Sequence, residues 1–352
     1  MTLAGLDVVT LAGRTVVRAR TDDGRVGCVA ANNRLPQVRS LFESLAAPFF
    51  TGRDARDLPN LTEEVRLAGR NYKFAGMPFW NAVAHCELAV WDLLGRAAGV
   101  SCADLLGRRR RRRLKVYVSR FQRDTTAEEE VAAVAEVLAR TGANAVKLKV
   151  GRRLFTTREQ NRRDAALVEL ARDRLGDGVT LFLDANGSYA AAEAVRMGAR
   201  FAQFGVGFLE EPCDWQDGAA TLAVRRGLDD AGVRLDLAGG EQDSSLAAFR
   251  RFAANRVFSP VQPDLFYCGG AVRLLTVARV ADAARLPVTP HAPRSGEAAF
   301  ADTVVRSTVP NLGPYQEYRD APELTAGTVP VPDGPGWGYD FTDDDLRSAE
   351  PA

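Results

Sequence analysis

Apolar and polar residues alternate with two different periods along this chain. Residues 6–30 alternate with the two-residue period of a strand on both sides of a polar turn at residues 21–24, which predicts a β-hairpin. Residues 38–45, 61–67 and 82–94 instead carry apolar side chains at helical spacing. The first hundred or so residues are therefore expected to form a small α+β unit.

From residue 116 onward, short apolar runs alternate with Ala-rich stretches of helical spacing. This alternation is typical of parallel strands that are each followed by a helix, and eight such strands favour a closed barrel. The predicted strands are residues 116–121, 145–150, 180–186, 207–212, 235–241, 257–264, 287–293 and 315–318.

We predict an α/β fold, namely a modified TIM barrel of the (β/α)7β type with an α+β capping domain. Residues 1–113 would form the capping domain and residues 114–320 the barrel that carries the active site. Residues 321–352 are rich in Pro, Gly and Asp and have too few apolar side chains for a core of their own. We expect this last segment to return to the capping domain.

Composition narrows the class of protein. The 352 residues suit one large barrel with a smaller companion, and 46 Lys and Arg residues against 45 Asp and Glu give a net charge of +1. This balance favours neither a nucleic-acid binder nor an acidic scaffold, so we expect a small-molecule partner. The 5 cysteines lack disulfide or metal-site spacing and fit buried, reduced thiols. No apolar run is long enough to span a membrane and no signal-peptide pattern opens the chain, so we expect a cytoplasmic protein.

Six consecutive arginines, residues 108–113, lie at the predicted junction of the two domains. Such a run could bind phosphates or a nucleic acid. A solvated connector is the simpler interpretation, because a nucleic-acid footprint normally dominates the charge of its domain. We therefore assign this run no chemistry.

Acidic residues end three consecutive predicted barrel strands: Asp184, Glu210 and Glu241. In a parallel barrel the strands end at one mouth, so side chains from distant parts of the sequence meet there. Three carboxylates make a hard oxygen site that suits Mg²⁺. A single strand-end acid is more often a helix cap or a surface charge, so the prediction depends on all three lying in register.

Lys147 and Lys149 lie two residues apart on the second predicted barrel strand, so both should face the barrel interior. We expect their mutual repulsion, a nearby metal and partial burial to lower the pKa of these amines until one can accept a proton. The alternative is two exposed lysines on an edge strand. The apolar residues that alternate with them argue against it.

Asp264 and His291 end the sixth and seventh predicted strands. Asp264 could then hydrogen-bond one ring nitrogen of His291 and raise the basicity of the other, which would make a general acid or base. The other histidine, His85, belongs to a helical run of the capping domain and is expected to be packed there. Glu317 ends the eighth strand and would hydrogen-bond a substrate oxygen, unless it is a surface acid.

Together these residues resemble those of the enolase superfamily and, within it, of the mandelate racemase-like subgroup. The resemblance spans most of the chain. It implies that Lys149 is the base on one face of the substrate and His291 the acid or base on the other. It further implies that Asp264 supports His291 and that Lys147 acts at the substrate carboxylate. The implied Mg²⁺ ligands are Asp184, Glu210 and Glu241.

The chain also departs from some branches of this subgroup. Dipeptide epimerases carry a lysine at the position of Asp264, and many galactonate and mannonate dehydratases carry a histidine at the position of Asn186. Substrate choice is expected to depend on loops of the capping domain at residues 32–36 and 71–80, although their side chains could equally pack between the domains. These loops contain Arg34, Tyr72, Lys73, Phe74 and Trp80.

The predicted chemistry follows from the weak acidity of a hydrogen alpha to a carboxylate. Its removal places a second negative charge on the carboxyl group, which a metal and cationic side chains can stabilise. We predict a Mg²⁺-dependent lyase that forms an enediolate and dehydrates an acid sugar to a 2-keto-3-deoxy acid. The alternatives are a racemase or epimerase of a 2-hydroxy acid and a lactone cycloisomerase. A non-enzymatic binding protein would be expected to lack one of these residues, and we expect a homo-oligomer.

Overall fold

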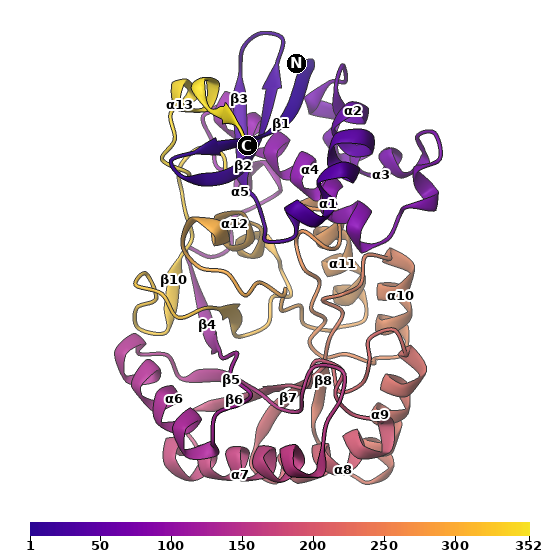
Figure 1. Cartoon of the computed structure of the whole chain (residues 1–352), viewed down its shortest axis with the longest axis vertical. Helices are drawn as coiled ribbons and strands as arrows, with labels where there is room; N and C mark the ends of the chain where they lie inside the picture. Colours follow the sequence, from indigo (N-terminus) through magenta and orange to yellow (C-terminus); the bar gives the residue numbers. More distant parts are fainter.

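The computed structural model describes residues 1–352 and contains two sheets (Figure 1). The smaller sheet lies in the upper part of Figure 1 together with both chain termini, and the larger one forms the barrel below it. The α/β class and the two-part architecture predicted from the sequence are confirmed. No helix combines the length and the apolar composition that crossing a bilayer would require.

The small sheet is antiparallel and has the strand order β11-β1-β2-β3. The predicted hairpin is confirmed as the pair β2 (Arg14–Thr21) and β3 (Val26–Ala30). The alternating pattern missed a second hairpin, because β1 (Leu3–Leu11) turns into β2 at Ala12 and Gly13. Both turn residues have positive φ angles, of 47° and 75°, as a tight two-residue turn requires.

Helix α4 (Met77–Ala98) packs across this sheet. It has a proline in its first turn and ends at Gly99, whose φ of 67° is the left-handed conformation that stops a helix. Gly27 of β3 approaches α4 so closely that a Cβ atom there would lie 2.1 Å from the backbone nitrogen of Leu93. Shorter helical segments complete this part: α1 (Leu35–Leu41), a π-helical turn (Phe42–Ala46), α2 (Ala47–Phe50), α3 (Leu58–Glu64) and α5 (Cys102–Leu105), with 3₁₀ turns at Ala55–Asp57, Val65–Leu67 and Asn71–Lys73.

The barrel consists of parallel strands surrounded by helices (Figure 1). Strands β4 to β8 pair in sequence order, and β9 pairs with the other side of β4. Isolated bridges through Val261 and Val288 link β8 to the segment before β9 and complete the ring. The strands are β4 (Arg113–Ser119), β5 (Ala145–Lys149), β6 (Thr180–Asp184), β7 (Val206–Glu210), β8 (Asp236–Ala238) and β9 (Gln316–Tyr318). The helices are α6 (Ala127–Thr141), α7 (Arg158–Leu175), α8 (Ala191–Ala202), α9 (Gly218–Asp230), α10 (Leu246–Ala254), α11 (Ala271–Ala283) and α12 (Phe300–Thr308), the last preceded by a 3₁₀ turn at Gly296–Ala299.

The sixth and seventh predicted strands, residues 257–264 and 287–293, are not regular strands. They join each other and their neighbours only by isolated bridges: Gly239 to Val261, Val261 to Val288, Asp264 to His291, and Val288 to Leu312. Prolines explain this difference, because each lacks the N–H group that a ladder needs. The remaining amides still close the wall of the barrel, for instance through a 2.9 Å hydrogen bond from the Thr289 nitrogen to the Val261 oxygen. The prolines are Pro260, Pro263, Pro287, Pro290 and Pro293.

Strand β5 shows how the barrel divides apolar from polar side chains. Val146 and Leu148 belong to the main hydrophobic core beneath the helices. Ala145 instead packs inside the barrel with a small aromatic cluster whose Phe182 and Phe208 rings stack 4.1 Å apart. Because side chains alternate along a strand, Lys147 and Lys149 lie on this inner side, between the aromatic floor and the open mouth.

Contacts between α4 and α11 hold the small sheet and its helices over the barrel mouth. The buried Glu87 carboxylate accepts hydrogen bonds of 3.0 and 2.9 Å from the backbone nitrogens of Ala271 and Val272, which open α11. Arg273 lies 3.6 Å above the Trp80 ring and pairs with Glu63. The loops above the barrel are therefore fixed relative to the strand ends below them.

The end of the chain runs back along both parts. Strand β10 (Thr328–Pro330) pairs antiparallel with β4, and after α13 (Asp343–Ser348) the short β11 (Glu350–Pro351) pairs with β1. The fully buried Trp337 donates its backbone N–H to Asp92 of α4 at 2.8 Å.

The arginine run at residues 108–113, which leads into β4, is held in part by hydrogen bonds to other segments of the chain. Arg109 donates to the Ser101 hydroxyl and the Pro332 carbonyl, and Arg111 donates to the Val309 carbonyl. Arg113 donates to the Thr328 hydroxyl at 2.7 Å. Alternate arginines of the run thus hold the connector against neighbouring segments.

Candidate active site

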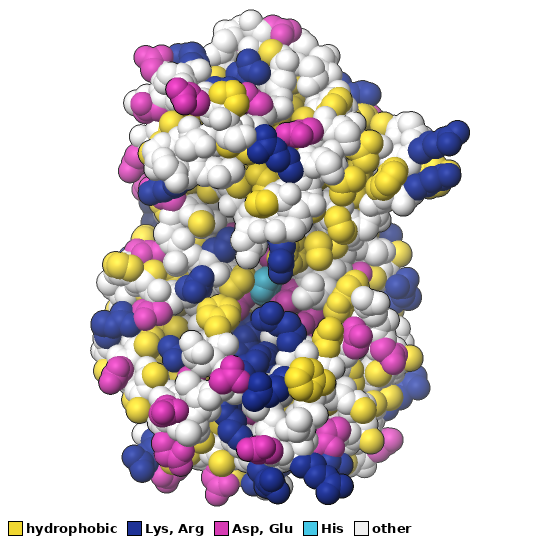
Figure 2. Space-filling view, viewed as in Figure 1, with side chains coloured by type: hydrophobic (Ala, Val, Ile, Leu, Met, Phe, Trp, Pro, Cys, Tyr) yellow, Lys and Arg dark blue, Asp and Glu magenta, His cyan; other side chains and the backbone are white.

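A cleft of about 1490 Å³ lies between the barrel mouth and the first helices of the small domain. Its barrel side is lined by Lys149, Glu241, His291 and Glu317, and its upper side by residues 30–39. Figure 2 shows basic and acidic side chains gathered around a histidine in the hollow across the middle of the molecule. A mostly preformed cleft with converging charged groups is the usual form of a small-molecule site.

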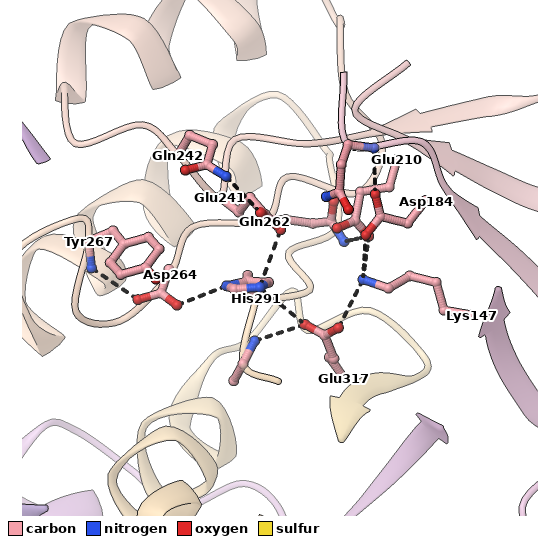
Figure 3. Close-up of polar contacts among 12 residues, drawn as sticks. Lys147, Asp184, Glu210, Glu241, Gln242, Gln262, Asp264, Tyr267, His291 and Glu317 are labelled. Atoms are coloured by element: carbon pink, nitrogen blue, oxygen red, sulfur yellow. Dashed lines mark hydrogen bonds and ion pairs between the residues drawn. The ribbon is translucent and has the colours of Figure 1, made fainter. Parts of the chain in front are cut away.

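The structure brings all the predicted site residues to this mouth, and Figure 3 labels all of them except Lys149. The strand register is responsible, because Lys149 lies beside Asp184 and Asp184 lies beside Glu210 in adjacent strands. Glu210 in turn lies beside Ala238 of β8, and Glu241 follows three residues later.

Lys147 is completely buried beneath the cleft and is held by carboxylates. Its Nζ atom lies 2.7 Å from Glu210 Oε2, 2.9 Å from Glu317 Oε1 and 3.8 Å from Asp184 Oδ2 (Figure 3). Burial lowers the pKa of this amine, but the negative charges of Glu210 and Glu317 outweigh burial and raise the pKa well above its ordinary value. The predicted lowering is therefore wrong for Lys147, which stays a cation.

Lys149 lines the cleft and is 8% exposed. Its ammonium group pairs with Asp184 and lies 3.2 Å from the Asn186 side-chain oxygen. Burial alone would raise the pKa of Asp184, but Lys149 and Lys147 lower it to about 2. Asp184 is therefore ionised at neutral pH.

Asp264 and His291 form the predicted pair. His291 Nδ1 lies 2.9 Å from Asp264 Oδ2, and the other Asp264 oxygen accepts hydrogen bonds from the backbone nitrogens of Phe266 and Tyr267 at 2.8 and 3.0 Å (Figure 3). His291 Nε2 faces Glu241 at 3.3 Å. Burial lowers the pKa of His291, but Glu241, Glu317 and Asp264 raise it to about 9, so the ring carries a proton on both nitrogens at neutral pH.

Family models cover both parts of the chain. The model for the mandelate racemase/muconate lactonizing enzyme N-terminal domain matches residues 6–107, and the model for enolase C-terminal domain-like proteins matches residues 129–345. The chain belongs to the enolase superfamily. Within it, the matched N-terminal domain supports the mandelate racemase-like subgroup.

Individual relatives of this enolase superfamily member agree with that placement. The chain is 27% identical to D-galactarolactone cycloisomerase of Agrobacterium fabrum, over 94% of this chain and 89% of that protein. It is 30% identical to D-gluconate dehydratase of Thermoproteus tenax, over 92% of this chain and 67% of that protein. A solved mandelate racemase/muconate lactonizing protein from Paracoccus denitrificans, complexed with magnesium, superposes with a TM-score of 0.86 and is 26% identical, covering 99% of this chain and 96% of that one.

The carboxylates of this superfamily member have the chemistry of a hard-cation site. Asp184, Glu210 and Glu241 contact Lys149, Lys147 and His291, so no group of three acidic or histidine side chains points at one common position. However, Glu210 Oε1, Glu211 Oε1 and Gln262 Oε1 are buried oxygens without a hydrogen-bond partner. Burying such oxygens is costly unless a donor or a cation satisfies them. Carboxylate and amide oxygens of this kind are ligands that suit Mg²⁺.

Two residues of this polar cluster were not predicted from the sequence. Gln262 donates to Glu210 Oε2 at 2.9 Å. Its position two residues before Asp264 on the same extended segment was a usable signal, since alternate residues face the same side. Glu211 is buried, and burial together with Asp184 and Glu210 raises its pKa to about 8. Glu211 has a φ of 41°, which the strand pattern did not indicate.

Arg294 was also missed. It donates to Asp264 Oδ2 at 3.1 Å and pairs with Asp302 at 2.9 Å, and it lies 4.8 Å from the Phe266 ring. Burial raises the pKa of Asp264, but Arg294 and His291 lower it to about 2. Arg294 therefore keeps the partner of His291 ionised.

The two loops expected to select the substrate differ in position. Residues 32–36 line the cleft as predicted. In the second loop, Tyr72 and Phe74 are 59% and 53% exposed and lie outside the cleft, whereas Trp80 is buried against Arg273. For residues 71–80 the substrate-selecting role fits only Met77 and Pro78, which line the cleft, whereas Trp80 follows the alternative of packing between the domains, against Arg273.

His85 is packed in the interior, as predicted. Its Nε2 atom accepts a 3.3 Å hydrogen bond from the backbone nitrogen of Asn32, and its ring lies 4.9 Å from that of Phe266. Burial lowers the pKa of His85 to about 4, so it is neutral and able to accept this bond. His85 therefore anchors the first cleft loop rather than taking part in chemistry.

Proposed function

We propose that this chain is a Mg²⁺-dependent enzyme that removes the alpha proton of a carboxylate and dehydrates an acid sugar to a 2-keto-3-deoxy acid. One observation carries this proposal. Lys149 and His291 reach one cleft from two different strand ends, and each contacts a member of the same buried carboxylate set, Asp184 and Glu241 respectively. This arrangement offers a proton acceptor and a proton donor to one bound substrate.

Asp184, Glu210 and Glu241 would hold the ion. A bound Mg²⁺ would supply positive charge against the substrate carboxylate and so stabilise the second negative charge that develops on it. The unpaired buried oxygen of Glu210 and the magnesium complex of the Paracoccus relative support this choice of ion.

We assign the following roles in the reaction to the side chains of the site. Lys149, acting as the neutral amine, takes the proton from the alpha carbon and becomes an ammonium group. Lys147 holds Glu317 in place, and Glu317 hydrogen-bonds a substrate oxygen beside it. His291 gives its Nε2 proton to the departing β-hydroxyl, which leaves as water, and the resulting enol becomes the 2-keto acid when its hydroxyl loses a proton and the β-carbon gains one. Asp264 holds the other ring nitrogen of His291 throughout.

Relatives whose names specify dehydratases support dehydration, and D-galactarolactone cycloisomerase supports a cycloisomerase as the second candidate. Racemisation needs the same two groups, because a proton removed on one face would return from the other. The three reactions share the first step and differ in the fate of the intermediate.

A screen of acid sugars with Mg²⁺, read by formation of a 2-keto product, tests the dehydratase assignment. Each acid is also incubated in D₂O and followed by NMR for exchange of the alpha proton. Exchange with product formation supports dehydration, whereas exchange with inversion or lactone isomerisation alone supports the other candidates. Absence of exchange with every acid in the library would contradict the proposed chemistry.

A further inference from the structure

Four side chains of alternating charge connect helix α12 to the cleft. They run from Asp302 on α12 through Arg294 and Asp264 to His291. Asp302 and Asp264 are 2% and 0% exposed, and the guanidinium group of Arg294 lies between their carboxylates. Each charge in this row therefore has a neighbour of opposite sign, as charges removed from water require.

The guanidinium group of Arg294 holds a different carboxylate at each of its two ends. Its Nη1 atom donates to both oxygens of Asp302, at 3.1 and 2.9 Å, and its Nη2 atom donates to Asp264 Oδ2 at 3.1 Å. Because a guanidinium group is planar, these hydrogen bonds fix its orientation. The position of Asp302 therefore determines where Arg294 meets Asp264.

Asp264 has four donors around its carboxylate. Oδ1 accepts from the backbone nitrogens of Phe266 and Tyr267, and Oδ2 accepts from Arg294 and lies 2.9 Å from His291 Nδ1. An ionised carboxylate offers about four acceptor positions, so these donors define the plane of the group. The His291 ring takes its direction from that plane. Without Arg294, the oxygen that holds His291 would lose one of its two partners.

Helix α12 is a firm anchor for this row. Asp302 lies in its first turn, where the positive end of the helix dipole stabilises a carboxylate. Residues 301–308 are all buried, and the helix packs against β4 and α5. One turn further along, Arg306 Nη1 donates to the backbone oxygen of Glu317 at 2.9 Å. The same helix thus supports the strand end that carries Glu317.

We propose that Asp302 and Arg294 are positioning residues for the proton donor of the reaction, and that α12 sets the direction of the His291 ring through them. This role rests on the proposed function of His291. Asp302 does not line the cleft, so its effect on the reaction passes through Arg294. Lys149 lies on β5 and has no contact with the row, so only one of the two proton transfers should depend on it.

The direction of the His291 ring can be measured in the resting protein without a substrate. His85 and His291 are the only 2 histidines, so ¹⁵N-labelled histidine gives two sets of ring signals, which His291→Asn assigns. We expect Asp302→Asn and Arg294→Met to speed exchange of the His291 Nδ1 proton with water by about tenfold or more. Arg294→Lys should lie between them and the wild type, because lysine keeps the charge but lacks the planar fork. Unchanged His85 signals show that each variant is folded.

The reaction supplies a second readout, with Mg²⁺ and an acid sugar that the screen above finds to be turned over. Asp302→Asn should lower kcat for dehydration by about tenfold to a hundredfold with KM unchanged. In D₂O, the alpha-proton exchange that depends on Lys149 should keep its wild-type rate. Asp282→Asn and Arg279→Lys, at exposed positions of α11, are the matched controls and should behave like the wild type in both measurements.

Wild-type exchange of the His291 ring proton in Asp302→Asn and Arg294→Met would overturn the inference, whether or not an acid is turned over. An equal loss of both proton transfers in Asp302→Asn would also overturn it, because that loss would be a general structural effect. If no acid shows alpha-proton exchange even with the wild type, the proposed function fails. The ring signals then still decide whether α12 positions His291.

Discussion

Lys147 and Lys149 face the same side of strand β5, yet only Lys149 reaches the cleft. Two residues along a strand correspond to about 6.6 Å, which is enough to separate a buried position from the mouth of the barrel. Lys147 is fully buried and bound to Glu210 and Glu317, whereas Lys149 is 8% exposed. Lys147 is therefore a buried structural cation, and Lys149 is the lysine that a substrate can reach.

The two proposed proton-transfer groups should be separable by isotope exchange. We expect Lys149→Ala and His291→Asn each to lower dehydration by about 10²-fold or more, because each removes a general acid or base. In D₂O, each variant should retain alpha-proton exchange only on the epimer that presents its proton to the remaining group. The measurement is NMR of both epimers of a substrate acid. Exchange of both epimers by both variants would contradict this division of roles.

Lys147 should be essential to stability as well as to activity. Lys147→Met leaves the buried carboxylates of Glu210 and Glu317 without their cation, and removing one partner of a buried pair costs about 3–5 kcal/mol. Urea unfolding without added metal measures the change in the free energy of unfolding. Lys73→Met, at an exposed lysine away from the cleft, is the matched control and should unfold like the wild type. Equal stability of the two variants would show that the Lys147 pairs are not structurally important.

The two-residue period of β5 was sufficient to predict that both lysines face inward, and strand ends correctly located the acids around one mouth. The sequence could not predict the pKa of Lys147, because the carboxylates that raise it come from β7 and β9 and become neighbours only when the barrel closes. Prolines prevent regular strand pairing at residues 257–264 and 287–293. The apolar pattern of these two segments alone did not indicate this irregular pairing.

Side chains on loops were the least predictable part of the site. Arg294 follows the irregular seventh segment, where no strand period indicates its direction, and so its contact with Asp264 was missed. Tyr72 and Phe74 were expected either near the substrate or packed between the domains, but both are exposed, in and just after the 3₁₀ turn at Asn71–Lys73. Residue type alone did not fix the direction of these side chains.

The assignment of Glu210 as a metal ligand can be tested by binding alone. Glu210→Gln keeps the size of the side chain but removes its negative charge, and we expect Mg²⁺ affinity to fall by about 10²-fold with loss of turnover. Calorimetric titration of Mg²⁺ measures this directly. Glu169→Gln, at an exposed glutamate on α7, is the control and should bind Mg²⁺ like the wild type. Unchanged Mg²⁺ affinity in Glu210→Gln would rule out this ligand.

Glu87 should make the stability of the protein depend on pH. Burial raises the pKa of Glu87 from 4.5 to about 7, even though three hydrogen bonds oppose the rise. Between these two pH values the folded chain holds a proton that the unfolded chain releases, so the free energy of unfolding falls as pH rises. One pKa unit corresponds to about 1.4 kcal/mol, so the contribution of this group is on the order of 3 kcal/mol.

Glu87→Gln should remove this contribution, because glutamine does not titrate. The measurement is the free energy of unfolding in urea from pH 4.5 to 8, with a chelator present so that metal binding does not add its own pH dependence. Glu64→Gln, at an exposed glutamate on α3, is the control and should keep the wild-type slope. If Glu87→Gln keeps that slope as well, the contact between α4 and the start of α11 does not hold a proton. If its slope is smaller by the expected amount, the junction above the barrel mouth is a titrating contact, and mildly acidic conditions strengthen it.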